Sequence, residues 1–164
     1  MESIAAPARG SAITGPPSPA QERLRVLVAE DDVCNQQVLR LMLERRGDRV
    51  RIVDNGRLAL VALAEASFDL MLLDMRMPEM DGFHVVESLR RSERDTLSYS
   101  RLPVIAVTAL AARSDRERCM EAGVDAFLSK PFRIRELYAA LDRTLGVCQP
   151  RGSAASLSTK ILVQ

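Results

Sequence analysis

Acidic, hydroxyl and amino side chains follow four separate apolar runs of this sequence. The triplet EDD at residues 30–32 follows VLVA, Asp74 ends LMLLD, Thr108 ends VIAVT, and Lys130 follows AFLS. Nearly continuous apolar runs are typical of parallel strands that helices cover on both faces. Ligands of such sheets bind outside the carboxyl ends of the strands. We therefore expect the four polar segments to meet at one edge of a sheet.

These residue types together favour phosphoryl chemistry. Crowded carboxylates repel one another unless a cation joins them, and hard oxygen ligands suit Mg²⁺. With Mg²⁺ as the cofactor, Asp74 can attack phosphorus, Lys130 can neutralise the phosphoryl oxygens, and Thr108 can donate a hydrogen bond. A single aspartate after a strand is more often a turn former or a helix cap. The combination of four such segments favours a site over four separate turns.

Lysine is rare in this chain, which gives Lys130 added weight. Of the 23 basic residues only Lys130 and Lys160 are lysines, and the others are arginines. A lysine offers a compact point charge, whereas arginine offers a planar fork. A surface lysine is the plain alternative, but its place at a strand end favours a functional role.

Apolar runs alternate with amphipathic ones from residue 25 onward, which predicts an α/β fold with a parallel sheet. The predicted strands are Arg25–Ala29, Arg49–Val53, Asp69–Asp74, Pro103–Thr108 and Ala126–Ser129. The predicted helices are Asn35–Arg46, Arg57–Ala66, Phe83–Arg94, Ser114–Ala122 and Arg133–Leu145. Gly47, Gly123 and Gly146 stand where left-handed C-terminal caps are expected, and Ser114 is a candidate N-cap.

Length and composition indicate one domain with loose ends. The 164 residues fit a single domain at 23–146, with a flexible leader at 1–22 rich in proline, alanine and serine and a flexible tail at 147–164. The net charge of +1 gives no general reason to bind nucleic acid or a membrane. No run approaches the roughly 18 apolar residues of a membrane span.

The cysteines indicate a reducing compartment. Cys34, Cys119 and Cys148 form no C-x-x-C pair and suggest neither disulfides nor zinc, so we expect a cytoplasmic protein. Cys34 beside the acidic triplet is a candidate redox handle, although a small space-filling residue is favoured. The single histidine, His84, has Glu87 three residues on, which is too little for zinc and favours a helix-surface residue.

Four motifs of this sequence resemble those of the receiver domains of two-component systems. In chain order they are VLVAEDD, LMLLDMRMPEMDG, VIAVTAL and FLSKPF. The resemblance extends over about 24–145 and implies a flavodoxin-like sheet of five parallel strands in the order 2-1-3-4-5, with five helices on both faces. It also implies a phosphohistidine donor, either a histidine kinase or a histidine phosphotransfer protein. A receiver is not a turnover enzyme, because it catalyses only its own phosphorylation and dephosphorylation.

Carried onto this sequence, the resemblance implies a role for each candidate residue. Glu30 and Asp31 would bind Mg²⁺ with Asp74, the phosphoacceptor, and with the backbone carbonyl of Arg76. Thr108 and Lys130 would sense the phosphoryl group. The remaining roles are an aromatic switch at Phe127, a cis peptide bond before Pro131, and control of phosphoryl lifetime by Arg76 and Leu110.

The glutamate at the first acidic position and the motifs VAED and MPEMDG make this sequence similar to the receivers of hybrid sensor kinases. Two roles stay open within the receiver interpretation, a diffusible regulator and a phosphorelay intermediate. Either role would use the surface of the fourth helix, fifth strand and fifth helix, which carries many arginines: Arg113, Arg116, Arg118, Arg133 and Arg135. A solvated charged face is the plain alternative.

Other classes of protein are disfavoured. A haloacid-dehalogenase-type phosphatase also uses aspartate, lysine and Mg²⁺, but it places its nucleophile in a D-x-D at the first strand and its acidic pair last. Here the acidic pair comes first, and Met75 and Arg76 follow Asp74. A nucleotide-binding module is disfavoured because neither G-x-G-x-x-G nor G-x-x-x-x-G-K-[ST] occurs.

Overall fold

The computed structural model describes residues 23–95, 101–109 and 113–146. Five parallel strands form one sheet in the order β2-β1-β3-β4-β5, which confirms the expected flavodoxin-like order. The strands are β1 (Arg25–Ala29), β2 (Arg49–Val53), β3 (Leu70–Leu73), β4 (Val104–Thr108) and β5 (Ala126–Ser129). β3 is shorter than predicted, so Asp74 lies just beyond the strand rather than within it. β4 begins after Pro103, which has no N–H to give to a neighbouring strand.

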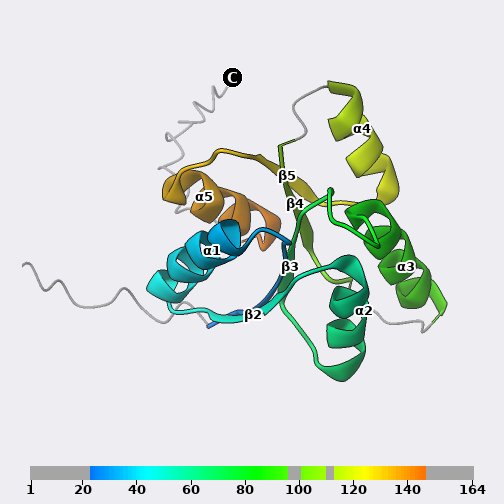
Figure 1. Ribbon diagram of the computed structural model, residues 1–164, viewed down its shortest axis with the longest axis horizontal. Coiled ribbons are helices and arrows are strands. Elements are labelled where there is room, and N and C mark those ends of the chain that lie inside the picture. The colour runs from blue at the N-terminus through cyan, green and yellow to red at the C-terminus, as the bar shows by residue number, and fades with distance from the viewer. Residues whose placement is uncertain (1–22, 96–100, 110–112, 147–164) are drawn as a thin grey trace, which may run out of the picture.

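Helices cover both faces of the sheet (Figure 1). They are α1 (Val33–Arg46), α2 (Gly56–Glu65), α3 (Gly82–Asp95), α4 (Arg113–Ala122) and α5 (Ile134–Thr144). α1 and α5 lie on one face, and α2, α3 and α4 lie on the other (Figure 1). The chain therefore forms three layers with the sheet in the middle.

The strands supply two apolar cores because successive side chains point to opposite faces. In β1, Val26 and Val28 pack with Leu39 of α1 and Leu137 of α5. The alternate residues Leu27 and Ala29 belong to the core under α2, α3 and α4. β1, β3 and β4 are buried at nearly every position, as their continuous apolar runs predict. The carboxyl ends of these central strands are thereby held in fixed relative positions.

The predicted glycine caps are confirmed and one predicted N-cap is wrong. Gly47 and Gly123 follow α1 and α4 with φ of 98° and 103°, a conformation that side chains with a Cβ rarely adopt, and Gly146 also has positive φ. α4 begins at Arg113, so Ser114 lies inside its first turn and is not the N-cap. α1 begins two residues earlier than predicted, because Asp32 caps it by accepting a hydrogen bond from the backbone N of Asn35 at 2.8 Å.

Several sequence-based expectations fall on residues outside the described ranges. These are the leader at 1–22, the tail at 147–164, Cys148 and Leu110. Among the helices that the structure describes, none has the length and apolar character needed to cross a membrane.

Candidate functional site

The predicted polar segments meet at the carboxyl edge of the sheet. Glu30 follows β1, Asp74 follows β3, Thr108 ends β4 and Lys130 follows β5. The order of the strands brings these four ends together although they lie far apart in the sequence. Glu30, Asp74 and Thr108 are buried, with 1%, 7% and 0% of their surface exposed. Asp31, next to Glu30, is exposed.

Lys130 joins two of the buried carboxylates. Its Nζ donates to Asp74 Oδ2 at 2.5 Å and to Glu30 Oε2 at 2.6 Å. Burial alone lowers the pKa of Lys130, but its hydrogen bonds to Asp74 and Glu30, together with their negative charges, outweigh burial and raise the pKa above its ordinary value. The side chain is therefore a fixed cation at the base of the site.

The acidic residues fit a divalent cation. One carboxylate oxygen each from Glu30, Asp31 and Asp74 lies within 4.8 Å of the others. The single ammonium group of Lys130 does not balance three carboxylates, and within the described residues Asp31 makes no hydrogen bond or ion pair. Oxygen ligands in small number, beside space for water, suit Mg²⁺. Among the described residues this is the only metal-sized group of histidine, cysteine or acidic side chains.

Asp74 is held on both of its oxygens. Oδ1 accepts from the backbone N of Arg76 at 2.9 Å, while Oδ2 accepts from Lys130. The backbone N of Asp74 donates to Ala29 O at 2.9 Å, which ties the residue to the end of β1. The Arg76 side chain is exposed. A ligand role for the Arg76 carbonyl stays a prediction, because no contact of that oxygen tests it.

Two amides at the start of α1 support Glu30, and sequence reasoning missed both. Asn35 Nδ2 donates to Glu30 Oε1 at 3.0 Å. Gln36 Nε2 donates to the backbone O of Glu30 at 2.7 Å and to Asp54 Oδ1 at 2.9 Å. Helical side chains lean toward the N-terminus of their helix. Amides in the first turn after an acidic strand end are the signal from which both residues could have been found.

The phosphoryl-sensing candidates lie side by side. The backbone N of Lys130 donates to Thr108 O at 3.0 Å, and Thr108 is in register with Ser129 of β5. The Lys130–Pro131 peptide bond is cis, as the resemblance implies. Phe127 is half-buried on β5, and the Arg116 guanidinium lies 5.1 Å from the centre of its ring. The roles of these residues in sensing and switching stay predictions.

An open cleft of about 530 Å³ adjoins the acidic residues. Asp31, Arg76, Met77, Phe83, Asp81 and Arg118 are among the residues that line it. The acidic residues are thereby open to solvent on this side.

His84 and Cys34, the weaker candidates from the sequence, do not belong to the acidic group. His84 is exposed on α3, as predicted, and its Nδ1 lies 2.7 Å from Asp81 Oδ1. Cys34 is exposed on α1, so the prediction that it fills space beside the first helix is wrong. Its place in the first turn of α1 points it away from the core that Leu39 and Leu43 enter.

The fold and the site are those of a receiver domain. The sequence matches the response regulator receiver domain family over residues 26–142. The chain belongs to this family. A parallel sheet of order 2-1-3-4-5 with acidic residues and a lysine at its carboxyl edge agrees with that membership.

The relatives in sequence include large kinases. Sensor histidine kinase GacS of Pseudomonas protegens is 36% identical over 113 residues, which cover 69% of this chain and 12% of that protein. Sensor protein GacS of Pseudomonas syringae is 34% identical over 137 residues, which cover 84% of this chain and 15% of that protein. The chain thus spans under a fifth of the length of either kinase.

Solved structures show the same fold. The receiver domain of a sensor histidine kinase from Pseudomonas aeruginosa, which has a magnesium ion in its active-site cleft, is 36% identical with a TM-score of 0.68, over 76% of this chain and 99% of that one. Chemotaxis protein CheY4 of Vibrio cholerae is 27% identical with a TM-score of 0.69, over 76% of this chain and all of that one. These comparisons give no support to a phosphatase of the haloacid-dehalogenase type.

Proposed function

We propose that this receiver domain accepts a phosphoryl group on Asp74 from a phosphohistidine donor. The observation that carries the proposal is the position of Lys130 Nζ, which contacts both Asp74 and Glu30. A half-buried ammonium group beside the acceptor oxygen can stabilise the charge of a transferred phosphoryl group. The Mg²⁺ that supports the reaction would be held by Glu30, Asp31, Asp74 and the backbone carbonyl of Arg76.

The transfer requires one bond to form and one to break. An Asp74 carboxylate oxygen forms the new O–P bond, the N–P bond of the donor breaks, and its electron pair returns to the imidazole. Mg²⁺, when bound, neutralises charge on the phosphoryl oxygens. The Arg76 backbone N–H and the Lys130 ammonium orient the two Asp74 oxygens before the donor arrives.

The phosphoryl group would then change the contacts of its neighbours. New anionic oxygens on Asp74 compete for Lys130 and offer an acceptor to the Thr108 hydroxyl, which lies at the end of the adjacent strand. Phe127 would respond to the movement of Thr108 and alter the surface of α4, β5 and α5. This mechanism consumes one phosphoryl group per event and does not make the domain a turnover enzyme.

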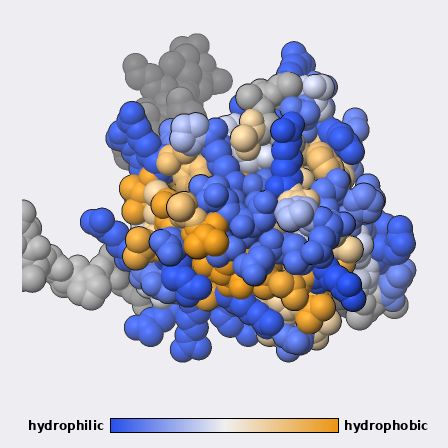
Figure 2. All heavy atoms as spheres, in the orientation of Figure 1, coloured by the Kyte–Doolittle hydropathy of each residue, from blue (hydrophilic) through white to orange (hydrophobic). Residues whose placement is uncertain are grey.

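An exposed apolar surface on α1 lies beside the site, and a protein donor would dock there. Apolar side chains gather over α1 on the face drawn in Figure 2, and α1 carries the exposed residues Val33, Val38 and Leu41. Val33 begins α1 only two residues after Asp31. A histidine kinase or phosphotransfer protein that covers these side chains would bring its phosphohistidine to the cleft. We place the reaction in the cytoplasm.

Transfer from a phosphorylated histidine phosphotransfer protein tests the proposal. Asp31→Asn and Asp32→Asn remove the same charge at adjacent positions, but only Asp31 belongs to the acidic group around Asp74. We expect Asp31→Asn to weaken Mg²⁺ binding, measured by calorimetry, by about tenfold or more and to slow transfer in parallel. Asp32→Asn should retain both, since asparagine also caps α1. Equal losses in the two variants would contradict the proposed Mg²⁺ site.

The same assay separates the two receiver roles. Transfer of the phosphoryl group from Asp74 onward to a second histidine protein supports a relay intermediate. A phosphorylated state that binds a downstream protein without such transfer supports a diffusible regulator.

A further inference from the structure

Arginines from both α3 and α4 line a groove between these two helices. It measures about 390 Å³, and arginine is the commonest residue of its wall. α3 contributes Arg90, Arg91 and Arg94, and α4 contributes Arg118. Glu87 and Glu121, one from each helix, also line it.

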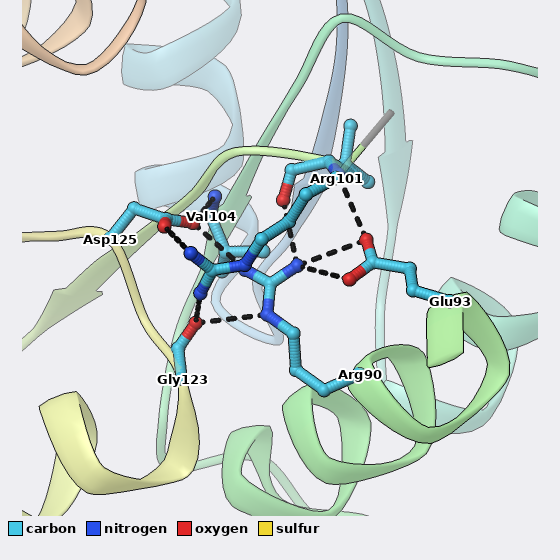
Figure 3. Close-up of polar contacts among 7 residues, drawn as sticks. Arg90, Glu93, Arg101, Val104, Gly123 and Asp125 are labelled. Atoms are coloured by element: carbon cyan, nitrogen blue, oxygen red, sulfur yellow. Dashed lines mark hydrogen bonds and ion pairs between the residues drawn. The ribbon is translucent and has the colours of Figure 1, made fainter. Parts of the chain in front are cut away.

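Arg90 lines this groove and is held by polar contacts to residues of several segments (Figure 3). It is only 7% exposed, and its guanidinium donates to Gly123 O at 3.0 Å, to Leu102 O at 2.9 Å and to Asp125 Oδ2 at 2.8 Å. Glu93 accepts two further hydrogen bonds from it. Arg90 is therefore fully engaged and ties α3 to the starts of β4 and β5. Its charge is compensated inside the protein.

Arg91 and Arg94 of the groove are not compensated in this way. Arg91 and Arg94 are exposed, and within the described residues neither makes a hydrogen bond or an ion pair. The Arg118 guanidinium lies 4.1 Å from the centre of the Phe83 ring, a contact with the ring face that does not use its N–H groups as donors, and its charge also acts on the Asp81 carboxylate. Two other arginines of α4 and α5 already have polar partners, Arg113 with Glu117 and Arg143 with Ala139 O.

We propose that the α3–α4 groove binds an acidic segment of a protein partner. Planar guanidinium groups match carboxylates bidentately, and three such groups converge here from two helices. Glu87 and Glu121 would repel the continuous phosphates of a nucleic acid, whereas a peptide can place amides or basic side chains opposite them. This interaction goes beyond the proposed phosphorylation and uses no residue of its acidic site. Phe83 and Arg118 line both the groove and the cleft, so the bound segment lies beside the phosphoryl site.

Titration of the ¹⁵N-labelled full chain with a short oligoglutamate peptide tests the proposal by NMR. We expect the largest shifts in α3 and α4, around Arg91, Arg94 and Arg118. The double change Arg91→Glu and Arg94→Glu should weaken binding by about tenfold, since two exposed charge pairs are lost. Glu87→Arg should strengthen binding, because it replaces one of the two carboxylates of the groove with a positive charge.

Matched controls separate the groove from general charge. Arg57→Glu changes an exposed arginine on α2 that has no polar partner among the described residues, and it should leave the affinity unchanged. Asp74→Asn should also bind as the wild type does, which separates this proposal from the phosphoacceptor assignment. Shifts centred on Phe127 and Arg135, equal weakening by Arg57→Glu, equal affinity for an oligouridylate, or no binding at all would each overturn it.

Discussion

Lys130 Nζ lies 2.5 Å from Asp74 Oδ2, so the only lysine of the described residues contacts the proposed phosphoacceptor directly. The ammonium also reaches Glu30, which places one positive charge between two buried carboxylates. A guanidinium group is larger and planar, and it would not enter this space with the same geometry. The choice of lysine in an arginine-rich chain thus has a structural reason.

Lys130→Arg should impair the response to phosphorylation more than phosphorylation itself. The variant keeps the charge but loses the compact donor that follows the phosphoryl group, so we expect labelling by acetyl phosphate at least in part. NMR shifts in α4, β5 and α5 that accompany phosphorylation of the wild type should be reduced. Arg57→Lys, at an exposed position of α2, serves as the control for the exchange of arginine and lysine. A full set of shifts in phosphorylated Lys130→Arg would contradict this role.

Asn35→Ala should weaken both folding and Mg²⁺ binding. The change removes the donor to Oε1 of the buried Glu30 carboxylate, which we expect to cost about 1 to 3 kcal/mol in the free energy of unfolding. Calorimetry should show lower Mg²⁺ affinity, since Glu30 loses its orientation. Gln37→Ala, on the exposed side of the same helix, is the matched control for helix propensity. An unchanged Mg²⁺ affinity together with lower stability would limit Asn35 to a structural role.

The convergence of Glu30, Asp74, Thr108 and Lys130 could be predicted from motifs on separate apolar runs, whereas the order of the strands was implied only by the resemblance to receiver domains. Because those runs are short, differ in sequence and are buried, few other assignments of the strands are possible. The amides that follow Glu30 at the start of α1 could have been recognised as candidates, but the hydrogen bond from Asn35 to Glu30 could not be predicted, because it depends on side-chain rotamers. The N-cap prediction for Ser114 was wrong because the first six residues of α4 are all polar, so no hydrophobic boundary marks the start of the helix.

Arg76 should influence how long the phosphorylated state lasts. Its exposed side chain lines the cleft with Asp31, and it donates hydrogen bonds but accepts no proton from water. We expect slow spontaneous loss of the phosphoryl group. Arg76→Asn, or Leu110→Glu at the second predicted position, should hasten it by about tenfold. Decay of the isolated phosphoprotein is the measurement, and slower decay in Arg76→Ala would show that Arg76 promotes hydrolysis instead.

Asp81→Ala should destabilise the domain in a manner that depends on pH. Asp81 precedes α3 and accepts from the backbone N of His84 at 3.0 Å, as an N-cap does, so its loss should cost about 1 kcal/mol at neutral pH. Burial tends to raise the pKa of Asp81, but hydrogen bonds and charge from His84 outweigh it and lower the pKa below 3.8. The carboxylate therefore stabilises the folded state above pH 3.8, and this contribution falls as the pH drops through the folded pKa.

Urea denaturation at several pH values measures this contribution. The difference between wild type and Asp81→Ala should shrink below pH 3.8. Asp81→Asn keeps a capping side chain without titrating, so it should remain within a few tenths of a kcal/mol of the wild type at neutral pH. A constant difference between wild type and Asp81→Ala at all pH values would contradict the assigned cap.

Mass spectrometry after incubation with Mg²⁺ and acetyl phosphate tests the central assignment most directly. The intact wild-type chain should gain one phosphoryl group that is stable in acid and labile in base, as an acyl phosphate is, and peptide mapping should locate it at Asp74. Asp74→Ala and Asp74→Asn should gain none, while Asp32→Asn should be labelled as the wild type is. Equal labelling of Asp74→Ala, or an adduct located at another residue, would contradict the assignment of Asp74 as the phosphoacceptor.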